Sequence, residues 1–139
     1  MEFNENKIKF LEMIQGVISR MASNSFMLKG WAVTLVAGTF ALSAKEANNL
    51  FFLIAYIPIV LFWFLDSYYL QLERKYRVLY SNAVEKKPDE IDFKLLVLPS
   101  KQEEKTCFYQ SLLSRTEAGF YLPTALLVGM VIVLSAVFI

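Results

Sequence analysis

The sequence predicts an all-α membrane protein with three transmembrane helices, an amphipathic N-terminal helix and a helical cytoplasmic portion. Hydrophobic residues make up 56% of the 139 residues, and the mean hydropathy is +0.43. Three apolar runs almost free of charge are each close to the roughly 20 helical residues that cross a bilayer. The chain has no histidine and one cysteine, Cys107, so His-based catalysis, imidazole metal sites and internal disulfides are excluded.

Hydropathy and charge divide the chain into four parts. We expect one domain, since 139 residues leave no room for a second of ordinary size. The predicted parts are a cytoplasmic amphipathic helix at 1–25, a transmembrane hairpin at 26–66 with spans 26–44 and 49–66, a cytoplasmic helical portion at 67–117, and a third transmembrane helix at 118–139.

Residues 2–22 predict the amphipathic helix, because their apolar side chains recur at three- and four-residue spacings. Such a helix either anchors the chain in the membrane interface or packs on a partner helix. Ser23, Asn24 and Ser25 then offer helix caps or a bend before the bilayer. We therefore expect the first span to begin as a separate helical unit.

The hairpin has its two spans joined by the short polar connector 45–49. Folding the chain at the connector places Lys29 opposite Asp66, because the two lie almost equally far from its centre. Trp31 and Trp63 fall opposite each other for the same reason. The sequence thus predicts that Lys29 and Asp66 lie at the same depth in the membrane on neighbouring helices. Their role is either a structural ion pair or a gate at the inner mouth of a conduit.

Small residues predict where helices pack closely in lipid. Gly30, Thr34 and Gly38 recur at four-residue intervals in the first span. Ala125 and Gly129 have the same spacing in the third span. Spacing alone does not decide whether the neighbouring helix belongs to the same chain or to another copy.

The second span leads into the cytoplasmic portion. Pro58 predicts a kink, because proline removes a backbone hydrogen bond, and helical spacing continues to about Ala83. Residues 85–99 fit a loop, a short strand or a packed turn. The tetrapeptide 100–103 has the form of a capping box, which predicts a helix running from there towards Arg115.

Positive charge is concentrated at one end of the spans. Lys29 precedes the first span, Arg74 and its neighbours follow the second, and Arg115 precedes the third. The other side holds only Lys45, which is next to Glu46. Lys and Arg near membrane ends favour the cytoplasm. We expect a multi-pass membrane protein with a cytoplasmic N-terminus and a periplasmic or extracellular C-terminus.

A basic group follows the second span. Arg74 and Arg77 share a helix face, Lys75 is beside them, and Lys86 and Lys87 follow shortly. Because Arg recognises phosphate with two hydrogen bonds, these five residues predict a binding site for a nucleotide or another anionic ligand. A topology signal combined with contact to acidic lipid explains the same charges.

Two functions fit these features. The first is a homo-oligomeric channel or membrane-depolarising effector gated from the cytoplasm, since three helices of one chain cannot enclose an aqueous pore. The second is a non-conducting membrane adaptor or accessory subunit that docks a cytoplasmic partner. The sequence has no Gly-rich phosphate loop, metal-ligand cluster or nucleophile–base pattern, so we expect neither an enzyme nor a cofactor.

Two segments have a recognisable sequence: MASNSFMLKGW at Met21–Trp31 and FWFLDSYYLQLERKYRVLY at Phe62–Tyr80. They resemble segments of a group of small three-helix bacterial membrane proteins from anti-phage defence operons, in particular the channel-like effector of the Hailong system. The resemblance implies a homo-oligomeric ion channel of the bacterial inner membrane that a nucleotide oligomer, made by a partner nucleotidyltransferase, keeps closed. Infection would release the channel and depolarise the cell. Binding of duplex DNA is not expected.

Overall fold

The computed structural model describes residues 5–43, 50–95 and 107–138. Every regular element within these ranges is a helix, so the predicted all-α class is confirmed for the described part of the chain. The elements are α1 (Glu5–Ser43), α2 (Leu50–Ile54), α3 (Tyr56–Glu85), the 3-10 helix η1 (Pro88–Glu90), α4 (Phe108–Leu112) and α5 (Arg115–Phe138).

Three helices in the described ranges are long and apolar enough to cross a membrane. They are Glu5–Ser43, Phe52–Glu85 and Arg115–Val137. Large hydrophobic side chains such as Phe26, Leu61 and Leu126 are exposed on their outer faces. An outer surface of this kind suits lipid, because a helix that is hydrophobic all round has to be buried in protein or membrane. The helices therefore match the three predicted spans.

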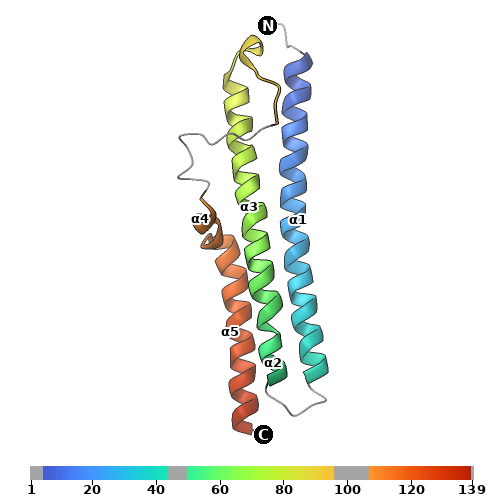
Figure 1. Ribbon diagram of the computed structural model, residues 1–139, viewed down its shortest axis with the longest axis vertical. Helices are drawn as coiled ribbons and strands as arrows, with labels where there is room; N and C mark the ends of the chain where they lie inside the picture. The colour runs from blue at the N-terminus through green and yellow to red at the C-terminus, as the bar shows by residue number, and fades with distance from the viewer. Residues whose placement is uncertain (1–4, 44–49, 96–106, 139) are drawn as a thin grey trace.

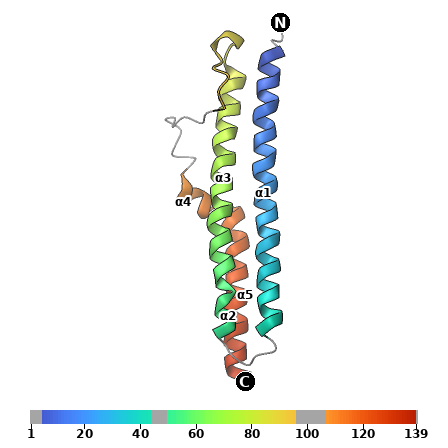
Figure 2. The ribbon, with the colours of Figure 1, turned by 45° about the vertical axis from the view of Figure 1, so that its right-hand side comes forward.

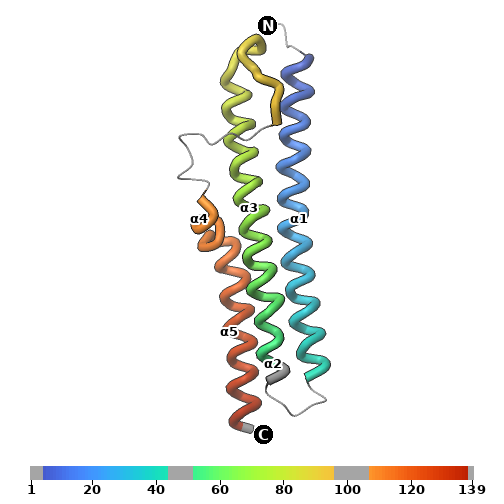
Figure 3. The backbone as a smooth tube through the Cα atoms, viewed as in Figure 1, coloured from blue at the N-terminus to red at the C-terminus, as the bar shows by residue number. Residues whose placement is uncertain are grey.

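The helices form an elongated bundle with two unequal halves (Figures 1 and 2). α1 and α3 run antiparallel along most of the length, and α5 lies beside the half of α3 that follows α2. The tube in Figure 3 shows the short α4 set beside the start of α5. One half of the molecule is therefore a three-helix bundle, and the other is a two-helix extension.

Each half has its own core. In the three-helix half, Ala32 and Val36 of α1 meet Ile59 of α3, and Tyr121 and Val128 of α5 complete the cluster. In the extension, buried residues of α1 and α3 pack together with one residue from the segment after η1; these are Phe10, Ile14, Ala83 and Ile91. The second core explains why α1 and α3 stay together in the extension, beyond the start of α5.

The expected separation of α1 into two units is wrong. α1 is one uninterrupted helix from Glu5 to Ser43, so Ser23–Ser25 do not end or begin a helix. Side-chain packing explains this, because Phe10 and Ile14 are buried against the far end of α3. Of the two alternatives for the N-terminal helix, the structure thus has packing on a partner helix.

The second span is interrupted close to Pro58. α2 ends at Ile54 and α3 begins at Tyr56, so the break falls at Ala55. Pro58 has no N–H for the Ile54 carbonyl one turn earlier, and next to that carbonyl the Ala55 N–H donates to the Phe52 carbonyl at 3.2 Å. The helix is therefore locally interrupted near Pro58, and the kink stays a prediction. The predicted extension of this helix to about Ala83 is confirmed, since α3 ends at Glu85.

The remaining connections differ from the expectations or lie outside the described residues. The segment 85–99, which by its sequence fits a loop, a short strand or a packed turn, contains η1, and residues 91–95 follow without regular structure. The connector 45–49 and the capping box at 100–103 are not in the described ranges. A turn at Leu113–Ser114 separates α4 from α5, so the third span begins at Arg115, three residues before its predicted start.

Candidate functional site

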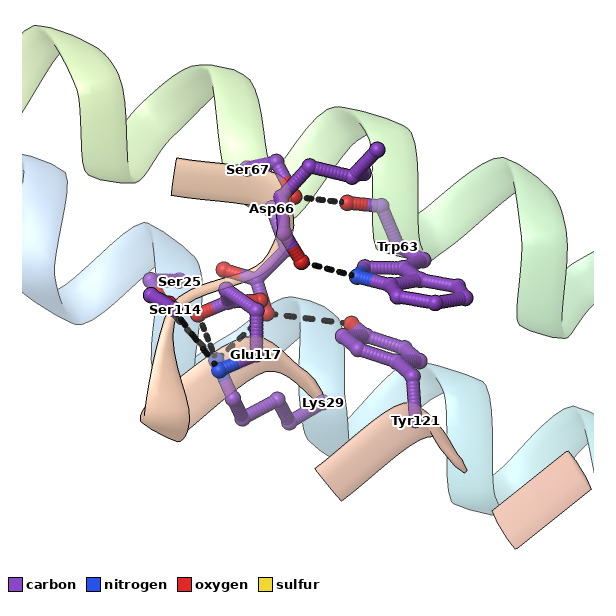
Figure 4. Close-up of polar contacts among 9 residues, drawn as sticks. Ser25, Lys29, Trp63, Asp66, Ser67, Ser114, Glu117 and Tyr121 are labelled. Atoms are coloured by element: carbon purple, nitrogen blue, oxygen red, sulfur yellow. Dashed lines mark hydrogen bonds and ion pairs between the residues drawn. The ribbon is translucent and has the colours of Figure 1, made fainter. Parts of the chain in front are cut away.

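The candidate site is a charge cluster that joins the three membrane-length helices. Lys29 of α1 places its Nζ 2.5 Å from Asp66 Oδ2 of α3 and 2.9 Å from Glu117 Oε1 of α5 (Figure 4). The ion pair that the hairpin geometry predicts is therefore present. Glu117 adds the third helix to it.

Local sequence positions each member of the cluster. Ser25 lies one turn before Lys29 on the same helix face, and its Oγ accepts a hydrogen bond from Lys29 Nζ at 3.1 Å. Glu117 lies in the first turn of α5, where the helix dipole favours a negative charge. Ser114 caps that turn, since its Oγ accepts from the Glu117 N–H at 3.2 Å. The turn between α4 and α5 thus sets the depth of Glu117.

Two aromatic side chains line one side of the cluster. Tyr121 lies one turn after Glu117, and its hydroxyl donates to Asp66 Oδ2 at 3.0 Å. The Trp63 ring stacks on the Tyr121 ring with centroids 6.0 Å apart and planes at 13°. Trp63 Nε1 also donates to the Leu112 carbonyl at 3.0 Å, which ties α4 to α3 (Figure 4). The aromatic pair therefore links the charges to the α4–α5 turn.

The cluster is buried and unbalanced in formal charge. Asp66 and Glu117 are both 0% exposed, and the Lys29 side chain is 16% exposed. Two carboxylates face one ammonium group. Asp66 Oδ1 and Glu117 Oε2 accept no hydrogen bond from the described residues. Burying ions is costly unless charge and hydrogen bonds are matched, so this arrangement is suited to hold a further positive charge or a proton.

Glu117 and Tyr121 are site residues that sequence reasoning missed. Hairpin symmetry relates Lys29 to Asp66, but no such symmetry fixes the depth of the third helix. A signal was present, because Glu117 directly precedes the uncharged run 118–139. An acid at a span boundary lies at the same end of the bundle as the boundary residues Lys29 and Asp66.

The predicted anion-binding residues lie on α3 beyond the cluster. Arg77 is exposed, but its Nη2 is 2.7 Å from Glu73 Oε1. Arg74 Nη1 donates to Ser111 Oγ of α4 at 3.4 Å, so this side chain contributes to the α3–α4 contact. Lys75 is partly buried. Within a single chain, Arg74 and Arg77 therefore already contact other side chains of the protein.

Lys86 and Lys87 are exposed and follow the end of α3. Lys86 is 9 positions after Arg77 and 12 after Arg74, which corresponds to about 14 Å and about 18 Å along the helix direction. The basic group is therefore spread along α3 and does not form one compact cluster. Ligand binding by these residues stays a prediction.

The small-residue pairs have different surroundings. A Cβ added at Gly129 would lie 3.0 Å from the hydroxyl oxygen of Tyr56, and this hydroxyl donates to the Ala125 carbonyl at 3.1 Å. Ala125 and Gly129 therefore pack within the chain. Gly30 and Gly38 are exposed, and a Cβ at either position would meet nothing within 4 Å.

Thr34 lies between these two glycines on α1 and is also exposed. Its Oγ1 donates to the Gly30 carbonyl of its own helix at 2.9 Å. Gly30, Thr34 and Gly38 together form an exposed face, which we call the small-residue face of α1. No described residue of the same chain covers it.

No family model, curated protein or solved structure matches this chain. The resemblance of Met21–Trp31 and Phe62–Tyr80 to a defence effector therefore stays a prediction. Fold and site define the class in physical terms: an all-helical protein with three membrane-length helices joined by a buried cluster of ionisable side chains.

Proposed function

We propose that this protein is a homo-oligomeric ion channel, or membrane-depolarising effector, of the bacterial inner membrane. The observation that supports it most strongly is the buried cluster of Lys29, Asp66 and Glu117 between three apolar helices. Ionisable groups inside a membrane segment are costly, and they commonly mark ion pathways, proton relays or gates. In the predicted orientation, the cluster lies at the cytoplasmic mouth of the conduit.

The conduit lies between copies of the chain. The interior of one three-helix bundle is filled by side chains, since Ala32, Ile59 and Val128 are almost completely buried. An aqueous path therefore needs several copies around an axis. The small-residue face of α1 supports such an assembly, because small side chains allow the backbones of two helices to approach closely in lipid.

The gating ligand is a nucleotide or another anion on the cytoplasmic side. α3 is one continuous helix from Asp66 to the basic residues Arg74, Lys75 and Arg77. A ligand that moves this part of α3 can therefore displace Asp66 in the cluster. The resemblance to a defence effector adds a nucleotide oligomer as the ligand and anti-phage defence as the biological role.

The test is ion flux through liposomes that contain the purified protein, together with its mass in detergent. We expect a mass that is a multiple of the single chain and a dissipation of the imposed potassium gradient. Added nucleotide should change the flux, and Lys75→Gln should weaken that response. Arg20→Gln is the matched control, because Arg20 is exposed on α1 outside the basic group. A strict monomer without flux would reject the channel.

The second candidate is a membrane adaptor, and the two-helix extension favours it. This extension has its own core around Phe10 and Ile14 and carries exposed charges, which suits a protein partner. An adaptor predicts capture of a cytoplasmic protein in the absence of ion flux. Binding that persists when Lys29 is replaced would favour the adaptor over the channel.

A further inference from the structure

The charge cluster contains more acid than base. Asp66 and Glu117 are fully buried, and Lys29 is the cation that contacts both. If all three groups were ionised, the cluster would carry one uncompensated negative charge in a region of low dielectric constant. Such a charge is expensive to bury, and proteins usually neutralise it.

The two carboxyl groups are also close together. Asp66 Oδ2 and Glu117 Oε1 both contact Lys29 Nζ, at 2.5 Å and 2.9 Å, so the groups converge on one atom (Figure 4). Each of them has a second oxygen, Oδ1 and Oε2, that is buried and accepts no hydrogen bond from the described residues. An acceptor left in that state costs free energy, and a proton on one carboxyl group would provide a donor.

We infer that Asp66 and Glu117 together bind one proton, which the two carboxyl groups share while Lys29 stays charged. The bound proton makes the cluster electrically neutral. Two carboxyl groups that share a site cannot both ionise readily, because each negative charge disfavours the other. The inference depends on the cluster alone, and it holds whether or not the protein conducts ions.

A proton fits this site better than a metal cation. The Lys29 ammonium already occupies the position between the two carboxyl groups, at hydrogen-bonding distance from both. A metal ion bound to the same oxygens would be repelled by this neighbouring positive charge. A proton attaches to one oxygen and leaves the lysine contact in place.

The described titratable groups that contact the pair come from α1 and α5. Lys29 comes from α1 and Tyr121 from α5, and the pair itself belongs to α3 and α5. On α4, Tyr109 is 71% exposed, and Cys107, the residue before α4, is exposed as well. Neither side chain is buried with the pair. Since Lys29 is the cation in direct contact, the count of one base against two acids holds for the described surroundings.

Loss of the proton would weaken the contacts of α5. Glu117 and Tyr121 join α5 to Lys29 and Asp66, so an added negative charge at this point opposes their approach. Proton release therefore favours a looser arrangement of α5 against the other two helices. The cluster is then a proton-binding site that couples the charge state to helix packing.

The test is infrared spectroscopy of the full-length protein in lipid membranes at pH 7. A protonated carboxyl group has a C=O stretching band that is separate from carboxylate and amide bands. We expect this band in the wild type, its loss in Asp66→Asn and in Glu117→Gln, and no change in Glu73→Gln. Glu73 is the matched control, because it is a partly buried acid of α3 that pairs with Arg77.

The wild-type spectrum decides the outcome even if a variant fails to fold. A wild type without the band at pH 7 overturns the inference. A band that persists in both Asp66→Asn and Glu117→Gln belongs to another of the 13 acidic residues, and it overturns the inference as well. A band that sodium ions remove at constant pH would identify a metal-cation site instead.

Lys29→Met gives an independent check. Without the ammonium group, both carboxyl groups are expected to be neutral, so the band should grow about twofold. An unchanged band in a Lys29→Met protein that retains the helical circular dichroism of the wild type would contradict proton sharing. Lys9→Met should leave the band as it is, since Lys9 pairs with Glu5 at the distant end of α1.

Discussion

Lys29 is the residue at which the three membrane-length helices meet. Its ammonium contacts Asp66 and Glu117, and it lies 6.0 Å from the ring centroids of Phe120 and Tyr121. Cations attract aromatic rings at this distance, so the two rings add to the ion pairs. A side chain with so many partners is expected to contribute to stability as well as to function.

Replacing Lys29 with methionine should destabilise the protein by about 3 kcal/mol, because the variant loses both buried ion pairs and the two carboxyl groups must take up protons to stay buried. The free energy of unfolding in detergent, followed by circular dichroism during denaturant titration, measures this effect. Lys9→Met is the control: that side chain is 65% exposed in a one-turn pair with Glu5, and its loss should cost less than about 0.5 kcal/mol. Equal losses in the two variants would contradict the proposed importance of the cluster.

At the residue scale, the sequence predicts half of the cluster. Lys29 and Asp66 are nearly equidistant from the hairpin connector, and this relation does not depend on long-range packing. Glu117 and Tyr121 depend on how deep α5 starts, which the turn at Leu113–Ser114 sets. The sequence offers no relation, comparable to equal distance from the hairpin connector, that would predict the depth of α5 in the bundle.

At the element scale, the contact between α3 and α5 depends on a small residue. Gly129 lies against the hydroxyl of Tyr56, so an added methyl group would be 3.0 Å from that oxygen. The ring of Tyr56 cannot yield easily, because its hydroxyl is held by the Ala125 carbonyl. Close approach of the two helices therefore requires glycine at this position.

Gly129→Ala should lower the free energy of unfolding by about 1–3 kcal/mol, since overpacking forces neighbouring groups to move. Gly119→Ala is the matched control on the same helix, because its Cβ would meet nothing within 4 Å. Alanine favours helix over glycine, so this control should be neutral or up to about 1 kcal/mol more stable. Chemical denaturation in detergent compares the two variants, and a stable Gly129→Ala protein would exclude the Tyr56 contact.

Element positions were predictable where hydropathy or proline determines them. The apolar runs predict the spans, and Pro58 predicts a kink close to the interruption observed at Ala55. The continuity of α1 was not predictable from Ser23–Ser25, whose residue types favour caps. Packing of Phe10 and Ile14 against α3 outweighs that local preference, and such tertiary contacts are not visible in a helical spacing pattern.

The whole molecule consists of a three-helix half and a two-helix extension. The positions of its basic residues predict how these two parts lie relative to the membrane. Basic residues such as Arg74 and Arg77 follow the cluster on α3, and Arg115 begins α5. Positive charge at span ends favours the cytoplasm, so the extension should lie inside the cell. The exposed apolar side chains of the three-helix half then face lipid.

Cysteine labelling in cells tests this arrangement most directly. Cys107 is the one cysteine of the chain and is exposed just before α4, so it reports the side on which the α4–α5 turn lies. A membrane-impermeant maleimide should leave Cys107 unlabelled in intact cells and label it after permeabilisation. In a Cys107→Ser background, Asn48→Cys in the predicted external connector should be labelled in intact cells. Labelling of Cys107 from outside, or recovery of the protein from the soluble fraction without detergent, would contradict the account.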